Sequence, residues 1–144
     1  MLTDAPSLGN SNVISSIVTR SNAIVLLLAG LALLFAPEVM LRAVTPAFPS
    51  QALWLGQLLA AAWLGVAALN WMNRSGVIGG IYARPLTNCN FVLWFVSAMS
   101  MVRVALTPGA SPATWAVTLV ACVFAIAYAA LVFRGPFDPL PTGR

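Results

Sequence analysis

The chain has 144 residues, of which 60% are hydrophobic and 7% are charged, whereas soluble domains carry roughly 25% charged residues. A soluble fold of this length cannot hide so much apolar surface. The apolar runs are long and unbroken, which also excludes the alternating strands of a membrane barrel. The net charge of +4 comes from arginines that stand singly at the ends of apolar runs, and this pattern is typical of membrane proteins and not of nucleic-acid binding.

The first apolar run predicts a membrane span at about residues 18–36, behind a flexible tail at residues 1–12. Residues 13–20 are mildly apolar, and the sequence does not decide whether they extend this span. A cleaved signal peptide also has a basic residue followed by an apolar run. Asp4 in the tail, and Leu34 in place of a small residue before Ala36, favour a retained anchor.

The segment from residue 37 to residue 49 connects the first two spans. Pro37 suits a first helical turn, and Glu38 and Arg42 are spaced to pair on one helix face. Pro46 and Pro49 end the segment. Its apolar residues predict a short helix that lies in the membrane interface between spans one and two.

The second span, residues 51–72, has no charged residue and no proline, and it matches the roughly 30 Å of a bilayer core. Trp54 and Trp71 suit the aromatic belts at its two ends. Small residues recur four apart in this span and in the last one, and such spacing allows close helix packing. The candidate helix-packing residues are Gly56, Ala60, Ala61, Gly65, Ala121, Ala125 and Ala129.

The next connection, residues 73–85, is rich in glycine and is bracketed by arginines. It lacks the strand and the spacing of a nucleotide-binding loop. We expect a tight turn at the membrane surface, with Arg74, Tyr82 and Arg84 contacting lipid head groups.

The third span, residues 86–106, is the most polar. Asn90, Trp94 and Ser97 share one helix face, and together with Gln57 and Trp63 of the second span they form a candidate ligand cleft. Hydrogen bonding between helices explains the same polar residues. Both interpretations stay open at this point.

The fourth span covers residues 113–133, and residues 135–144 form a second flexible tail. The chain is therefore predicted to be a single membrane domain, an all-α integral membrane protein with a four-transmembrane-helix bundle. Cys89 and Cys122 lie at different depths, so we expect no disulfide between them.

Four spans place both chain ends on the same side of the membrane. The positive-inside rule makes that side cytoplasmic, because it holds five of the seven arginines. Arginine without lysine and alanine-rich spans suggest a bacterial genome. We therefore expect a multi-pass protein of the bacterial inner (plasma) membrane with cytoplasmic N- and C-termini. The five arginines are Arg20, Arg74, Arg84, Arg134 and Arg144, and the other two are Arg42 and Arg103.

The reactive groups of the chain are few. The sequence contains no histidine, and its acids, Asp4, Glu38 and Asp138, all lie outside the spans. Haem ligation by histidine and a Ser–His–Asp triad are excluded. We expect no metal, no cofactor and no catalytic residue. An enzyme remains conceivable only through Cys, Ser, Tyr or Arg chemistry.

Two functional hypotheses follow. The first is a packing, accessory or assembly subunit that acts through helix–helix contacts, as a homo-oligomer or within a larger membrane complex. The second is a binder or facilitator of a hydrophobic or neutral small molecule or lipid, which would use the cleft between spans two and three. Membrane lipids are partners under both hypotheses, and nucleic acid under neither.

Overall fold

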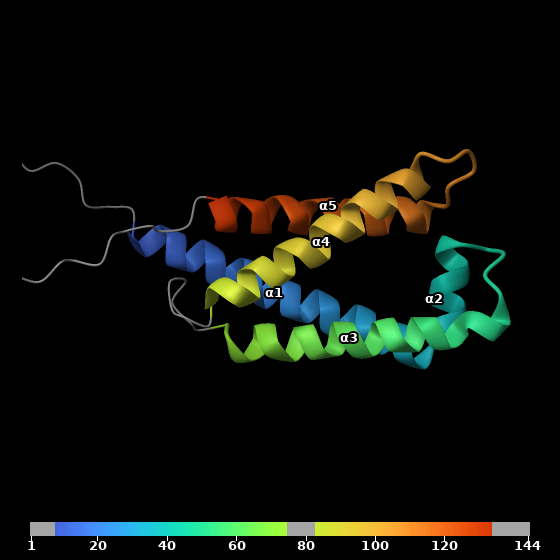
Figure 1. The fold of residues 1–144 in the computed structure, drawn as a ribbon, viewed down its shortest axis with the longest axis horizontal. Coiled ribbons are helices and arrows are strands. Elements are labelled where there is room, and N and C mark those ends of the chain that lie inside the picture. Colours follow the sequence, from blue (N-terminus) through green and yellow to red (C-terminus); the bar gives the residue numbers. More distant parts are fainter. Residues whose placement is uncertain (1–7, 75–82, 134–144) are drawn as a thin grey trace, which may run out of the picture.

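The computed structural model describes residues 8–74 and 83–133, and every regular element in these residues is a helix (Figure 1). Four of the helices are long and apolar enough to cross a membrane. The predicted four-helix membrane bundle is confirmed. The elements are α1 (Leu8–Phe35), α2 (Pro37–Val44), the 3-10 helix η1 (Ser50–Ala52), α3 (Leu53–Met72), α4 (Ala83–Ala105) and α5 (Pro112–Phe133).

The first helix is longer than the sequence predicted. It begins at Leu8, and its spanning segment, Val13–Phe35, includes the residues whose assignment was open. No proline interrupts this stretch, so the helix continues past the start of the apolar run. The helix therefore includes part of the predicted first tail. The rest of that tail, and the second predicted tail at residues 135–144, lie outside the described residues.

The predicted helix between spans one and two is confirmed as α2. Pro37 lies in its first turn, and the Glu38 carboxylate pairs with Arg42 at 2.6 Å. Arg42 Nη2 also donates to the Ser50 hydroxyl at 3.0 Å, which links α2 to the start of η1. Leu41 faces α3, while Val39 on the other side of α2 is exposed. This two-sided character suits a helix at the membrane surface.

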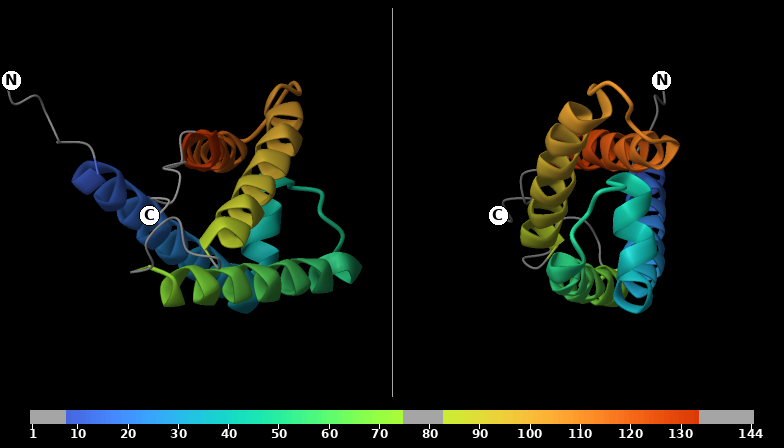
Figure 2. Two further views of the ribbon diagram at one scale, coloured as in Figure 1. Left: turned by 60° about the vertical axis from the view of Figure 1, so that its left-hand side comes forward. Right: turned by 90° about the vertical axis from the view of Figure 1, so that its right-hand side faces the viewer.

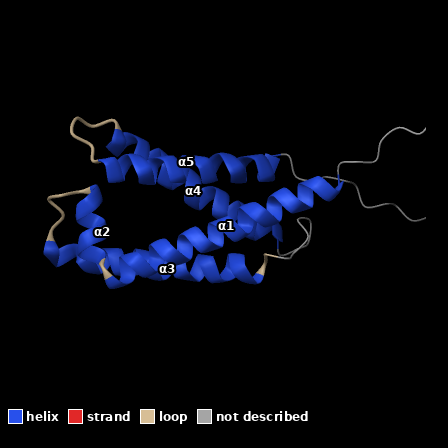
Figure 3. Ribbon diagram, turned by 180° about the vertical axis from the view of Figure 1, so that it is seen from behind, coloured by secondary structure: helices blue, strands red, loops and turns tan. Residues whose placement is uncertain are grey.

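The long helices form two tightly packed pairs, α1 with α3 and α4 with α5. Figure 2 shows α4 slanting from the α1–α3 side toward α5. The start of α1, the end of α3, the start of α4 and the end of α5 lie at one end of the bundle, which we call the chain-end face. The far face carries α2 and the turn at residues 106–111, and both are clear from behind (Figure 3).

Small residues bring α1 and α3 together. A Cβ added at Gly30 would lie 3.0 Å from the Leu64 side chain and 3.4 Å from the Ala60 carbonyl oxygen. Ala60 is fully buried, and Gly56 lies against the side chains of Leu33 and Leu41. The backbones of the two helices can approach this closely only because these positions carry almost no side chain.

The second pair uses alanines in the same way. Ala98 of α4 and Ala121 and Ala125 of α5 are buried together in the core. The Thr118 hydroxyl lies 3.3 Å from the Met101 carbonyl oxygen, which adds a polar contact between α4 and α5. In each pair, the backbones of the two helices therefore lie close together.

The residues predicted to pack helices divide into two sets. Gly56, Ala60, Ala121 and Ala125 are buried and Ala129 is half-buried, all within this chain. Ala61 and Gly65 are exposed on α3, and a Cβ at Gly65 would meet nothing within 4 Å. Contact of these last two with another chain stays a prediction.

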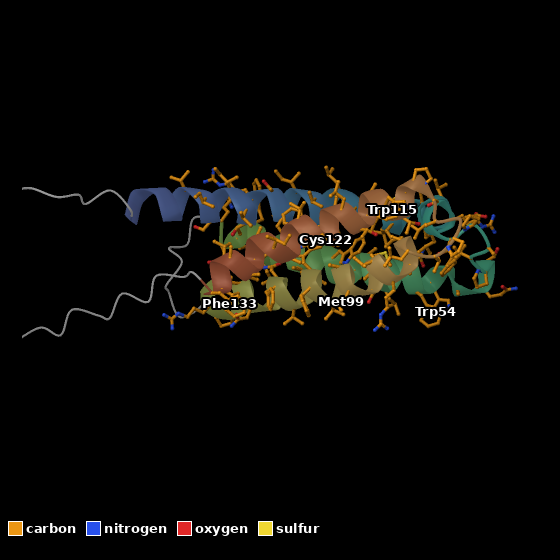
Figure 4. The ribbon with its side chains drawn as sticks, turned by 90° about the horizontal axis from the view of Figure 1, so that it is seen from above. Trp54, Met99, Trp115, Cys122 and Phe133 are labelled. Atoms are coloured by element: carbon orange, nitrogen blue, oxygen red, sulfur yellow. The ribbon has the colours of Figure 1, made fainter. Side chains whose placement is uncertain are left out.

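Large apolar side chains cover the outside of the bundle, as expected where lipid is the solvent. Exposed examples run from Trp54, toward the far face, through Met99 to Phe133 at the chain-end face (Figure 4). Trp71 is also exposed, at the opposite end of α3 from Trp54, so the two lie where aromatic belts are found.

We predict that Gly30→Leu destabilises the folded chain and that Gly65→Leu does not. The added side chain at Gly30 has to displace Leu64 and approach the Ala60 backbone, and such overpacking typically costs about 1–3 kcal/mol. The same substitution at Gly65 enters open space. Thermal unfolding in detergent micelles measures both variants, and equal losses of stability would contradict this packing of α1 on α3.

Candidate functional site

A cluster of buried polar side chains joins all four long helices near the chain-end face. α1 contributes Asn22, α3 contributes Asn70, α4 contributes Asn90 and Trp94, and α5 contributes Tyr128. The three asparagines are 0% exposed, Tyr128 is 1% exposed and Trp94 is 7% exposed. We call these five residues the asparagine network.

Asn70 and Asn90 form a reciprocal amide pair between α3 and α4. Each Nδ2 donates to the Oδ1 of the other, at 3.0 and 2.9 Å. The second hydrogen of each amide goes to a carbonyl one turn back in its own helix, Val66 for Asn70 and Leu86 for Asn90, both at 2.9 Å. Both amide groups are therefore held in a single orientation.

Asn22 lies at the centre of the network. Its Nδ2 donates to Asn90 Oδ1 at 2.8 Å and to the Tyr128 hydroxyl at 2.9 Å. Its Oδ1 accepts a hydrogen bond from Trp94 Nε1 at 2.8 Å. The Tyr128 hydroxyl also hydrogen-bonds the Thr19 side chain, one turn before Asn22. One side chain of α1 thus connects to both helices of the other pair.

The hydrogen-bonding groups of the asparagine network are all paired within the chain. Among the described residues, no buried side-chain nitrogen or oxygen lacks a hydrogen-bond partner. An amide left unpaired in a low-dielectric interior costs several kcal/mol, on the order of 2–7. Because every amide hydrogen of the three asparagines already has an acceptor, a ligand can accept a hydrogen bond from these amides only after an internal bond opens.

Aromatic rings pack beside the polar groups of the network. Trp94 stacks on Phe124 with ring centroids 4.8 Å apart, so α4 and α5 share an aromatic contact beside the polar one. Trp63 of α3 is half-buried and packs against the same core. Trp63 and Trp94 thus bring bulky rings from both pairs into one core, where small residues would leave a void.

A second polar contact lies at the far face. Ser111 caps the start of α5, since its Oγ accepts from the Thr114 backbone N–H at 3.1 Å. The Ser111 hydroxyl donates to the Ala43 carbonyl at 2.7 Å, and the Thr114 hydroxyl donates to the Val44 carbonyl at 3.2 Å. We call this contact between the end of α2 and the start of α5 the α2–α5 latch.

The hydrogen bonds of the α2–α5 latch form because helix ends carry unpaired backbone groups with partial charge. The last carbonyls of α2 have no partner within their own helix, and they carry partial negative charge. The start of α5 is the positive end of its helix. Two hydroxyls that follow Pro108 and Gly109 in the connecting turn, Ser111 and Thr114, therefore supply donors where α2 needs them. Gly109 has φ +84°, which lets this turn close.

The structure brings together only part of the predicted ligand cleft. Asn90 and Trp94 belong to the asparagine network, and Ser97 is half-buried farther along α4. Trp63 is half-buried against the core, and Gln57 is exposed on α3, away from the buried residues. Ligand binding by these residues is untested and stays a prediction.

The sequence analysis did not include Asn22, Asn70 and Tyr128 in the site. A signal existed: each of the four spans carries a hydrogen-bonding residue toward the chain-end face, and Asn22 is the member from the first span. A single asparagine in one apolar run is uninformative, but one such residue in every run predicts a shared layer.

Two of the three predicted head-group residues, Arg74 and Arg84, lie at the chain-end face. Arg74 is half-buried just after α3; its guanidinium carbon is 4.5 Å from the Trp71 ring centroid, and its Nη1 donates to the Trp71 carbonyl at 2.7 Å. The Ser16 hydroxyl donates to the Arg74 carbonyl at 3.0 Å, so α1 fixes this end of α3. Arg84 is exposed at the start of α4, and Tyr82 lies outside the described residues.

Metal-ligating groups do not gather in residues 8–74 and 83–133: no group of three or more His, Cys, Asp or Glu side chains occurs there. Cys89 and Cys122 are free, as predicted. Protein-family models, curated proteins and solved structures were compared with the chain, and none of them matches. The site is therefore interpreted from its geometry.

We predict that Asn22→Leu lowers the stability of the folded chain by about 1–3 kcal/mol, because Trp94, Asn90 and Tyr128 all lose a partner while staying buried. Asn88→Leu is the matched control, since Asn88 is exposed on α4 and its replacement is expected to change stability by no more than about 0.5 kcal/mol. Unfolding in micelles by a denaturing detergent measures both. A loss for Asn22→Leu no greater than that for Asn88→Leu would show that the network does not form.

Proposed function

We propose that the protein is an accessory or assembly subunit of the membrane that acts through helix–helix contacts. The observation that supports this proposal most is the self-satisfied asparagine network: the polar groups inside the bundle are used to hold its own helices together. Such a bundle presents the outer faces of its helix pairs to neighbouring proteins, and its three buried asparagines offer no unpaired donor to a ligand.

The surface we assign to partner contact is the outward face of α3. Ala61 and Gly65 are four residues apart and exposed, and the space above Gly65 is open. Small residues at this spacing let a second helix approach closely within a bilayer. The partner is a second copy of this chain or a helix of a larger membrane complex.

A binder of a small neutral molecule is the competing function. A ligand that accepts hydrogen bonds from Asn22 or Trp94 has to replace bonds of 2.8 Å that already exist. This cost is the reason that we place the assembly role first.

We further propose that the chain lies in a bacterial inner membrane with its termini in the cytoplasm. Arg74 and Arg84 flank the α3–α4 connection at the chain-end face, where Arg74 is held against Trp71. Their charge favours the anionic cytoplasmic leaflet and its head groups.

Gly65→Leu tests the assembly role. We expect native mass spectrometry from mild detergent to show an oligomer or complex for the unaltered chain and loss of that assembly for Gly65→Leu, with folding intact because the side chain enters open space. Ser100→Leu, at an exposed position of α4, is the matched control and retains the assembly.

The same spectra test the competing function. A retained small molecule that survives Gly65→Leu, and that is lost with Trp94→Phe, would favour the binder. An assembly unchanged by Gly65→Leu would remove the outward face of α3 from the proposal.

Orientation is tested by fusing reporters to the C-terminus. We expect a fluorescent reporter that folds in the cytoplasm to be active there, and a periplasm-dependent phosphatase reporter to be inactive, because the arginines favour a cytoplasmic chain-end face. The opposite pattern would invert the proposed topology.

A further inference from the structure

The two helix pairs differ in how they are held internally and how they are held to each other. Inside each pair the two helix backbones approach each other closely. Gly30 and Ala60 allow this between α1 and α3, and Ala98 and Ala121 allow it between α4 and α5. α2 belongs with the first pair, since it packs on α1 and α3. Close packing of small residues makes each of these groups a rigid unit.

The polar contacts between the two units lie at opposite faces. Near the chain-end face, the asparagine network supplies five hydrogen bonds that cross from α1 or α3 to α4 or α5. At the far face the α2–α5 latch supplies the two bonds from Ser111 and Thr114 to the end of α2. The units also share an apolar core, to which Leu26 and Ala67 contribute from one unit and Ala98 and Ala121 from the other.

The asparagine network and the α2–α5 latch differ in the free energy that is needed to open them. All members of the network are buried, so opening it strands several amides in a dry interior. The α2–α5 latch has only two bonds. The Ser111 bond is exposed, and the Thr114 bond is part-buried although Thr114 itself is buried; both acceptors are backbone carbonyls that water can satisfy as well. Contacts with exposed hydrogen bonds and few buried neighbours open at low cost. The far face is therefore the weaker closure.

We propose that the protein is hinged: the α4–α5 pair turns as a unit about the asparagine network, and release of the α2–α5 latch opens the seam between the pairs at the far face. This motion is separate from the proposed assembly role, which depends on the outward face of α3. It gives the bundle two states, closed and open, that differ in whether α2 holds the start of α5.

Distances between spin labels test the hinge. In a chain with Cys89 and Cys122 replaced by alanine, one label pair at Val39→Cys and Leu106→Cys reports the far face, and a second pair at Val13→Cys and Phe133→Cys reports the chain-end face. All four positions are exposed in the structure. The measurement is made in lipid nanodiscs.

The latch is removed with Ser111→Ala and Thr114→Val together. We expect the far-face pair to shift to a longer distance and the chain-end pair to keep its distribution. Thr118→Val is the matched control, because Thr118 bonds only within the α4–α5 unit, to Met101 and to Thr114. It is expected to leave both distributions unchanged.

Thr114→Val alone provides the second variant, since it keeps the Ser111 cap of α5 if the double variant does not fold. A far-face distribution that this variant leaves unchanged would overturn the proposal. Lengthening at both faces together would overturn it as well, because the units would then separate without a pivot.

Discussion

The fold depends on amide hydrogen bonds made where no water can replace them. Apolar packing alone holds two helices together in lipid only weakly, because the tails of the lipids are as apolar as the side chains. Asn22 changes this balance, since its amide finds acceptors only at Asn90 and Tyr128. A helix that rotates or slides out of register leaves that amide unpaired, and the penalty selects one arrangement.

Two kinds of side chain then determine how closely the helices pack. Residues without bulk, such as Gly30 and Ala60, set the spacing within a pair, whereas the two pairs meet in a core that contains larger side chains such as Leu26 and Trp94. The first gives stiff units, and the second gives an interface whose geometry is decided by a few directional bonds. The same division explains how a chain with so few charged residues can still have one defined fold.

Much of the fold could be predicted from the sequence because the physics is local. Residues 51–72 form a span since they carry no charged residue and no proline, and Pro37 falls in the first turn of a helix, as predicted. The start of α1 was placed too late, because a helix can extend beyond the bilayer and polarity does not mark its end. The spacing of small residues along the sequence also could not predict which of them are buried. Gly56 and Gly65 look alike in the sequence, but Leu33 of α1 and Leu41 of α2 cover the first, whereas nothing covers the second.

The site was harder to predict because it is built from residues that are distant in the chain. Asn90 and Trp94 are visible as one helix face, but their partner Asn22 lies two spans away, and its role depends on which helices become neighbours. A double-mutant cycle on Asn22→Ala and Asn90→Ala in micelles tests this account most directly. A coupling free energy of about 1 kcal/mol or more between the two positions is expected, as for residues that share one hydrogen-bond network. Losses of stability that add to within about 0.5 kcal/mol would show that α1 and α4 are not joined in this way.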